Sequence, residues 1–293
     1  MDMRTLTHVI ILSETLHFGR ASERANISTS ALSRNIRQLE AELNTTLFDR
    51  DNRSVQLTAN GQAFVRYARD AVQQWDQIRF ALTDTTDELH GEVSLYCSVT
   101  ASHSILVDLL NEVRPEHPGV EIRLQTGDPQ HAIDRVVALE EELAIAARPA
   151  KLPSSVAFQP IQTSPLVFIA PATSTDAPLS DLPPRDPADW QQTPMILASS
   201  GLARSRVDAW FRDLGVTPKI YAQVAGNEAI VSMVSLGLGV GVVPEIVLET
   251  SPFAERVRTL DVAPALAPYE LGLVTLKRHL ANPLVSAFWS LAN

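Results

Sequence analysis

Residues 28–43 of the chain read STSALSRNIRQLEAEL, a pattern that predicts one amphipathic helix capped by Ser28 or Thr29. The apolar residues that repeat at helical spacing, and so face a core, are Leu32, Ile36, Leu39 and Leu43. The opposite face near the helix start carries hydroxyls and arginines: Thr29, Ser30, Ser33, Arg34 and Arg37. Such a face suits a DNA major groove, because hydroxyls contact phosphate or base and arginine contacts guanine. Taken alone, this stretch fits a solvated amphipathic helix equally well.

The preceding residues predict two further helices. Apolar residues at helical spacing between Leu6 and Leu16 indicate a first helix that ends at 17–19. A short second helix follows, in which Ala21 and Ala25 are small enough for close packing. A turn at 26–28 then leads into the helix of residues 28–43, which gives the order helix, helix, turn, helix.

The residues after this helix predict a two-stranded hairpin. Leu47–Arg50 and Ser54–Leu57 are short strand patterns on either side of a turn at 51–53. A hairpin directly after a DNA-reading helix is a wing. We therefore expect Arg50 and Arg53 to contact the sugar-phosphate backbone or the minor groove.

The same region resembles the signature of LysR-type transcriptional regulators. The matching residues are His17-Phe18-Gly19-Arg20-Ala21, Ala31-Leu32-Ser33-Arg34, Ile36, Leu39-Glu40, Leu47-Phe48, Arg50, Leu57-Thr58 and Gly61. The resemblance implies a winged helix-turn-helix in which base and phosphate contacts come from Thr29, Ser30, Ser33 and Arg34, with Arg53 in the wing. Many family members carry Gln-Pro where this chain has Thr29-Ser30, which leaves open the base that is read there.

A long helix is predicted after the wing, because residues 58–86 contain no proline and one glycine. Its apolar residues follow the spacing of a coiled-coil seam: Phe64, Ala68, Ala71, Trp75, Ile78 and Leu82. We expect this seam to form a homodimer whose two heads bind an inverted repeat in double-stranded DNA. Packing of the helix on its own domain is the alternative. The family resemblance implies that dimers assemble into a homotetramer.

Alternating strands and helices follow Gly91, which predicts an α/β domain with a parallel or mixed sheet and helices on both faces. The expected elements include strands at 93–97, 120–124 and 143–147, a helix from Ile105 that ends at Pro115, and a helix at 129–139. A proline-rich stretch between Pro171 and Pro187 is expected to be a surface loop.

The family resemblance implies that this α/β part is a two-lobed effector domain similar to periplasmic binding proteins. The expected organisation is an N-terminal all-α winged helix-turn-helix at 1–58, a linker (dimerisation) helix at 59–90 and an effector-binding domain at 91–293. Lobe one is expected at 91–162 plus 268–293, and lobe two at 163–267.

Ligands of such sheets bind beyond the carboxyl ends of the strands, where helices begin. Three strand-to-helix turns are candidates, and two charged residues end neighbouring strands. The candidate effector-binding residues are Ser98, Thr100, Ala101, Ser102, Asp128, Arg148, Ser199, Ser200, Gly201, Asn227 and Glu228. Free N–H groups and hydroxyls at helix starts bind a carboxylate. For any single turn plain N-capping explains the residues as well, and the two charges also fit ordinary exposed positions.

Within the family, the effector domain resembles regulators of the isoleucine–valine pathway. The segments that carry this resemblance are Cys97–Ala101, Thr126–Asp128, Leu143–Ala146, Glu228-Ala229, Val231–Val234, Pro244-Glu245, Pro283-Leu284 and Ala287–Trp289. The resemblance implies an activator that responds to 2-acetolactate or 2-aceto-2-hydroxybutyrate and contacts RNA polymerase. A LysR-type regulator of another pathway, with another small carboxylate, is the alternative.

The charge distribution agrees with DNA binding by the head alone. The formal net charge is −10, yet residues 1–69 hold nine Arg against seven Asp and Glu and so carry +2. Every Lys or Arg before Lys151 is arginine, the side chain suited to phosphate and guanine. The acidic remainder excludes the rest of the chain as a nucleic-acid surface.

Other functional classes lack their motifs. Gly237, Gly239 and Gly241 superficially resemble a dinucleotide loop but lead from a helix into a strand, the wrong order for one. We expect no catalytic residue, no metal site and no cofactor beyond a small-molecule effector. Cys97 fits a buried core thiol, with a redox sensor as the alternative. The chain has no membrane-spanning run and no signal peptide pattern, so we expect a cytoplasmic protein rather than a secreted solute-binding protein.

Overall fold

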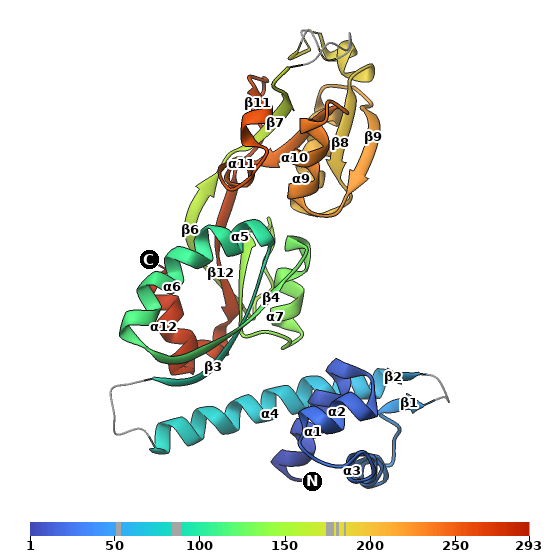
Figure 1. Cartoon of the computed structure of the whole chain (residues 1–293), viewed down its shortest axis with the longest axis vertical. Helices are drawn as coiled ribbons and strands as arrows, with labels where there is room; N and C mark the ends of the chain where they lie inside the picture. The colour runs from blue at the N-terminus through green and yellow to red at the C-terminus, as the bar shows by residue number, and fades with distance from the viewer. Residues whose placement is uncertain (51–53, 84–88, 174–178, 180–181, 185, 293) are drawn as a thin grey trace. The chain divides into compact units, whose positions relative to one another are not determined.

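The computed structural model describes residues 1–50, 54–83, 89–173, 179, 182–184 and 186–292 (Figure 1). The chain divides into two units, which are described separately. The first unit is the N-terminal head with its long helix. The second contains two five-stranded sheets with their helices.

The head is a small helical domain with a two-stranded hairpin. Asp2, His17 and Ser28 cap the first three helices, each by accepting a backbone N–H with its side chain. Leu16 and Asn44, which directly follow α1 and α3, adopt left-handed backbone angles that end these helices. The elements are α1 (Met3–Thr15), α2 (Phe18–Arg24), α3 (Thr29–Leu43), β1 (Phe48–Arg50), β2 (Val55–Leu57) and α4 (Ala59–Thr83), with β1 and β2 antiparallel.

Three members of the predicted apolar face of α3 form the core of the head. Leu32, Ile36 and Leu39 are buried against residues of α1 and β1. The fourth, Leu43, was wrongly expected in this core and is 39% exposed. It lies in the last turn of the helix, directly before the left-handed Asn44 turns the chain away.

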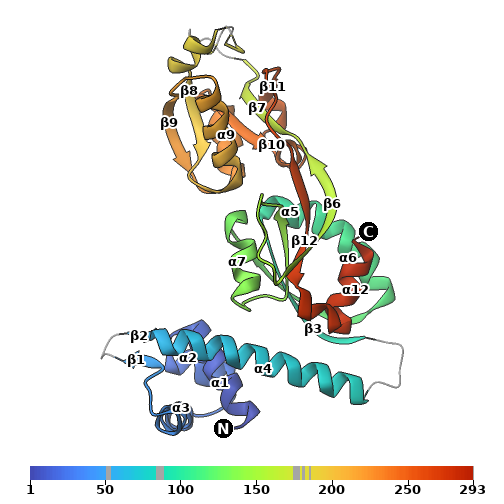
Figure 2. The same cartoon turned by 180° about the vertical axis from the view of Figure 1, so that it is seen from behind.

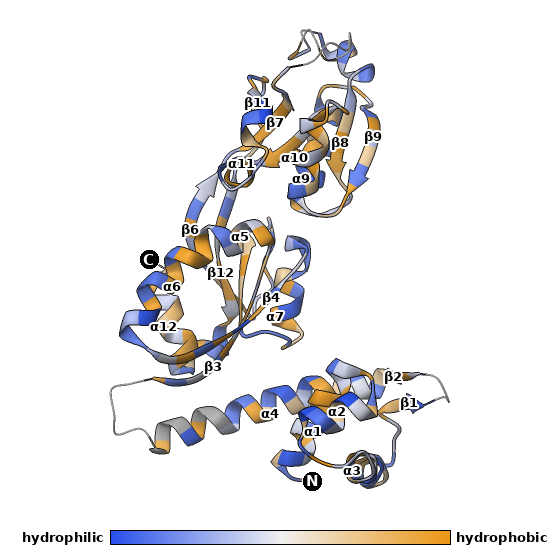
Figure 3. Ribbon diagram, viewed as in Figure 1, coloured by the Kyte–Doolittle hydropathy of each residue, from blue (hydrophilic) through white to orange (hydrophobic). Residues whose placement is uncertain are grey.

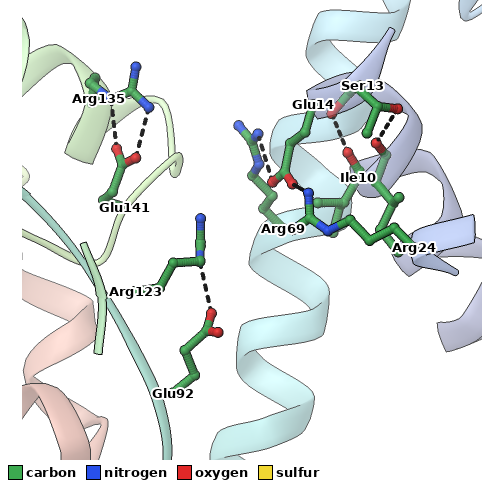
Figure 4. Close-up of polar contacts among 11 residues, drawn as sticks. Ile10, Ser13, Glu14, Arg24, Arg69, Glu92, Arg123, Arg135 and Glu141 are labelled. Carbon is green, nitrogen blue, oxygen red and sulfur yellow. Dashed lines mark hydrogen bonds and ion pairs between the residues drawn. The ribbon is translucent and has the colours of Figure 1, made fainter. Parts of the chain in front are cut away.

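Ion pairs join the helices of the head. Glu14 of α1 pairs with Arg24 at 2.7 Å and with Arg69 of α4 at 3.7 Å (Figure 4). Val65 and Ala68 of α4 are buried, and Val65 belongs to the apolar core of the head. The first half of α4 is thus part of this domain.

The first lobe of the second unit is built on a mixed sheet of order β4-β3-β5-β12-β6. Strand β3 lies inside it, parallel to β4 and β5, and all five residues from Val93 to Cys97 are buried. Helices on both faces explain this continuous burial, which replaces the alternation seen in the sequence. The strands are β3 (His90–Cys97), β4 (Gly119–Thr126), β5 (Leu143–Ala147), β6 (Val156–Ser164) and β12 (Tyr269–Leu276).

The helices of this lobe correct two predicted boundaries. Pro115 lies inside α6, which continues to Glu116. Residues 129–139 form a 3₁₀ turn and a short helix that ends at Val137 rather than one helix. The helices are α5 (Val99–His103), α6 (Ile105–Glu116), η1 (Pro129–His131), α7 (Ala132–Val137), η4 (Lys277–Ala281) and α12 (Pro283–Leu291).

The second lobe has a sheet of order β11-β7-β10-β8-β9. Leu179, within the predicted proline-rich surface loop, is buried in the core of this lobe, so that stretch is not purely a surface loop. The elements are β7 (Leu166–Pro171), η2 (Pro187–Gln191), β8 (Pro194–Ala198), α9 (Gly201–Asp213), β9 (Lys219–Val224), α10 (Asn227–Ser235), β10 (Val240–Pro244), α11 (Glu245–Glu249), η3 (Ala254–Arg256) and β11 (Val257–Leu260).

The two lobes are connected by two strands. The chain passes from β6 to β7 at Pro165 and returns from β11 to β12, as Figure 2 shows. Hydrophobic residues are frequent along the strands of both sheets (Figure 3). One apolar cluster contains residues of both lobes, among them Val93 and Ala101 of the first and Ile230 of the second. The lobes therefore share part of their core.

Candidate DNA-binding and effector sites

The recognition face of α3 is open to solvent. Thr29, Ser30, Arg34 and Arg37 are exposed and Ser33 is half-buried. The Thr29 hydroxyl lies 2.9 Å from the Ser22 hydroxyl, and the Ser30 hydroxyl 3.1 Å from that of Ser28. These contacts fix the hydroxyls at the start of the helix, while both arginine side chains remain exposed. The geometry is that of a helix able to enter a groove of DNA.

The structure gives Arg50 a different role from the predicted one. Its guanidinium donates to Glu40 Oε2 at 2.6 Å and lies over the Phe18 ring at 5.0 Å. The other oxygen of Glu40 accepts the backbone N–H groups of Leu47 and Phe48 at 2.9 and 3.1 Å. Arg50 thus fastens the hairpin to α3 rather than presenting a free cation to phosphate. Arg53 lies outside the described residues.

The predicted seam of the long helix is divided into two parts. Ala68 is fully buried, and Phe64 packs on the core of the head. Farther along α4, Trp75, Ile78 and Leu82 are 51%, 54% and 80% exposed. The first part therefore packs within its own domain, as the alternative stated, and the second part is an apolar stripe exposed on α4.

The first predicted effector turn is joined to lobe two. The Ser98 hydroxyl caps α5 by accepting the Ala101 N–H at 3.1 Å. The Thr100 N–H and hydroxyl both donate to Glu228 Oε1, at 3.0 and 2.5 Å. The Ser102 hydroxyl instead donates to the Val99 carbonyl at 2.7 Å. The structure thus brings Thr100 together with Glu228 and turns Ser102 back onto its own helix.

Asp128, one of the two charged residues predicted at strand ends, lies in a turn held by side chains that the sequence did not single out. Asp128 accepts the Gln130 N–H at 3.1 Å and caps η1. The Tyr96 hydroxyl donates to the Asp128 carbonyl at 2.9 Å, and a Cβ at Gly127 would lie only 2.3 Å from that hydroxyl oxygen. A side chain at this position would therefore have to displace the Tyr96 hydroxyl.

An ion pair between Arg135 and the buried Glu141 packs against Tyr96. Arg135 donates to both oxygens of Glu141, at 2.8 and 2.7 Å (Figure 4), and its guanidinium lies over the Tyr96 ring at 4.9 Å. Glu141 is 3% exposed. The sequence gives little indication that Arg135 and Glu141 pack against Tyr96, because Tyr96 and Glu141 occupy positions where a core residue is expected.

The candidates in lobe two lie at the start of two helices. Ser199 and Ser200 are exposed, and the Ser200 side chain forms no cap hydrogen bond. Gly201 has φ +87°, and a Cβ there would lie 3.5 Å from Cβ of Gln130 in lobe one. Asn227 is the first residue of α10 and is half-buried. This second inter-lobe approach was not anticipated, because Gln130 carries no motif.

Arg148 is placed at the crossing strands rather than beside Thr100. It donates to Glu270 at 3.1 Å and lies over the Phe158 ring at 5.4 Å. Its backbone N–H also bonds to the Glu270 carbonyl at 2.8 Å. These contacts tie the end of β5 to β12, where the chain enters lobe one from lobe two. Arg148 accordingly braces the connection between the lobes.

Cys97 is fully buried at the end of β3, and we expect its thiol to resist alkylation in the folded protein. Burial raises the pKa of this thiol to about 12, and only the thiolate is a strong nucleophile. Because its folded pKa exceeds its unfolded pKa, the thiol favours folding below about pH 9, and this contribution is lost as the pH rises toward 12. Mass spectrometry after iodoacetamide treatment at pH 8 checks this. Rapid labelling without denaturant would indicate a reactive thiol.

Across the residues that the structure describes, no group of three or more His, Cys, Asp or Glu is arranged to hold a metal ion. Among the described helices, none combines the length and the apolar character needed to cross a membrane.

The exposed face of α3, the β1–β2 hairpin held by Arg50 and Glu40, and the two-lobed domain are the features of a winged helix-turn-helix regulator with an effector domain. Residues 3–62 match the family model of bacterial regulatory helix-turn-helix proteins of the lysR family, and residues 86–293 match the LysR substrate binding domain. The chain therefore belongs to the LysR family. It is a DNA-binding transcription regulator with a domain for small-molecule effectors, and it is not an enzyme.

Particular relatives are similar over nearly the whole chain. The HTH-type transcriptional activator IlvY of Haemophilus influenzae is 44% identical over 292 residues, which cover 99% of each chain. The HTH-type transcriptional regulator IlvY of Escherichia coli is 42% identical over 294 residues, covering 99% of this chain and 98% of that one. Among solved structures, full-length OxyR of Pseudomonas aeruginosa superposes with a TM-score of 0.74 at 21% identity, covering 100% of this chain and 94% of that chain.

Proposed function

We propose that this protein activates genes of isoleucine–valine biosynthesis in response to 2-acetolactate or 2-aceto-2-hydroxybutyrate. The observation that carries the proposal is the 44% identity with the activator IlvY, which extends through both the head and the effector domain. The chemistry of the inter-lobe turns supports it. Ser98, Thr100 and Asn227 offer hydroxyls and an amide, which suit the carboxylate, tertiary hydroxyl and ketone of an acetohydroxy acid.

The effector is tested by calorimetric titration of the full-length protein with 2-acetolactate. We expect saturable binding of 2-acetolactate, with no binding of pyruvate or valine at the same concentrations. Pyruvate lacks the tertiary hydroxyl and valine carries an ammonium group in its place. Binding of pyruvate or valine but not of 2-acetolactate would assign the protein to another pathway with another small carboxylate, and would leave the DNA-binding function intact.

As a regulator of bacterial genes, the protein acts in the cytoplasm on double-stranded DNA. Two heads joined through the exposed part of α4 would bind an inverted repeat whose half-sites are separated by whole helical turns. The apolar stripe of Trp75, Ile78 and Leu82 supports pairing, because each of these side chains is more than half exposed on α4. Further assembly into a tetramer and contact with RNA polymerase complete the proposed activator.

Pairing through α4 predicts that Ile78→Glu halves the mass of the protein in solution. A buried glutamate at a coiled-coil seam places two like charges together in an apolar interface, which costs several kcal/mol. Sedimentation equilibrium of the full-length protein measures the mass. The matched control is Gln74→Glu, an exposed position on the same helix outside the seam. An unchanged mass for Ile78→Glu would place the dimer interface elsewhere.

A further inference from the structure

The contact between Thr100 and Glu228 joins the two lobes at the predicted effector site. Thr100 is 5% exposed in lobe one, and Glu228 is exposed in the first turn of α10 in lobe two. One carboxylate oxygen of Glu228 accepts both the N–H and the hydroxyl of Thr100, at 3.0 and 2.5 Å. Gly226, with φ +84°, forms the turn that starts α10 two residues earlier.

The same two donors are those that an acidic effector needs. The neighbouring Ala101 N–H is already taken by the Ser98 hydroxyl, so Thr100 supplies the remaining paired donors of this turn. Two carboxylates cannot share them, because like charges at hydrogen-bond distance from one group repel strongly. Arg148 offers no free cation to a second carboxylate, because it pairs with Glu270 at 3.1 Å where the strands cross between the lobes.

The exposure of Glu228 makes its displacement feasible. Its carboxylate can move into water without leaving an unpaired charge in the interior. A second inter-lobe approach, the van der Waals spacing of Gly201 and Gln130, contains no charge. Loss of the Thr100–Glu228 contact would therefore remove a charged contact between the lobes.

We propose that Glu228 is a resident carboxylate that occupies the Thr100 donors in the effector-free protein and is displaced by the carboxylate of the effector. This inference rests on the proposed acidic effector and deepens it, because it names the residue that couples effector binding to the contact between the lobes. A ligand shifts a conformational equilibrium only through contacts that differ between the two states. Exchange of one carboxylate for another at Thr100 supplies such a difference.

The first test compares 2-acetolactate affinity by calorimetry in the full-length protein and its Glu228→Gln variant. The amide keeps the size of the side chain but bonds more weakly to Thr100, because charge-assisted hydrogen bonds are roughly twice as strong as neutral ones. We expect Glu228→Gln to bind 2-acetolactate about threefold to tenfold more tightly. The control Glu249→Gln removes an exposed charge from the same lobe and should leave the affinity unchanged. Unchanged or weaker binding by Glu228→Gln overturns the proposal, and weaker binding would mean that Glu228 contacts the effector directly.

A second test needs no effector. In the full-length protein we expect Glu228→Gln to lower the melting temperature of the effector domain by about 2 °C. The loss should be smaller in a Thr100→Val background, where the hydroxyl partner is already absent, so the two substitutions are not additive. Additive effects would overturn the inter-lobe contact. Non-additive effects, together with no binding of 2-acetolactate by the unaltered protein, would support the contact and reject the proposed effector.

Discussion

Arg34→Ala is expected to lower the affinity of the protein for its operator about 100-fold. Arg34 is exposed on the recognition face of α3, within the family model matched by residues 3–62. A bidentate arginine–guanine contact discriminates by about 1–3 kcal/mol, and a dimer that binds an inverted repeat makes the contact twice. Fold and stability should not change, because no buried group loses a partner. Fluorescence anisotropy with a promoter fragment at fixed salt measures the effect.

The matched control for this experiment is Arg4→Ala, which removes an exposed arginine of the same head from α1. It lowers the positive charge equally but lies outside the recognition face, so its effect should stay below about threefold, the range of a surface charge. If Arg34→Ala weakens binding of operator and unrelated DNA equally, and lowers the slope of log affinity against log salt concentration by about two, Arg34 contacts a phosphate in each half-site instead of a base. Equal losses for Arg34→Ala and Arg4→Ala would reject the recognition face.

Glu40→Ala is expected to remove the contacts that hold the β1–β2 hairpin on α3 and to destabilise the head by about 2–5 kcal/mol. The substitution removes the acceptor of the Leu47 and Phe48 N–H groups, which belong to residues that are each 1% exposed. A buried donor left without a partner costs about 1–3 kcal/mol. Arg50 also loses its carboxylate, 2.6 Å away. For a domain of this size, the melting temperature should fall by about 10 °C or more, and DNA affinity should fall with it.

Glu42→Ala serves as the control for Glu40→Ala. Glu42 lies two residues farther along α3 and pairs at 3.2 Å with the N-terminal amine, and its side chain is 53% exposed. Such a surface pair contributes at most about 1 kcal/mol. Thermal denaturation followed by circular dichroism compares the two variants. Equal melting temperatures for both would mean that Glu40 does not hold the wing.

The residue patterns of the chain predicted those helices and strands that are formed by residues close together in the sequence. The spacing of Leu32, Ile36 and Leu39 predicted α3 and its buried face, which the structure confirms. The hairpin β1–β2 and the α/β alternation after Gly91 were equally visible. Helices and hairpins are formed by residues close in sequence, so periodicity and turn residues specify them.

Strands with an unusual composition were missed. Strand β6 contains Pro160, which argues against a strand, yet β6 lies at the edge of its sheet and pairs with β12 across an irregularity in register. Proline is tolerated at an edge because its missing N–H is not needed by a second neighbour. Strand β11 and helix α11 are only four and five residues long, too short for a periodic pattern.

The sequence by itself determined the family and the buried face of α3, while the DNA-reading face of α3 and the effector turns stay predictions. Only the tertiary structure decided the partners of individual side chains. It assigned Arg50 to Glu40, Arg148 to Glu270 and Thr100 to Glu228, the last pair 128 residues apart in the chain. The physical reason is that the sequence around an arginine or a carboxylate does not show whether that side chain contacts DNA, an effector or another side chain. Which partner it takes depends on contacts between distant segments, and local periodicity contains no information about them.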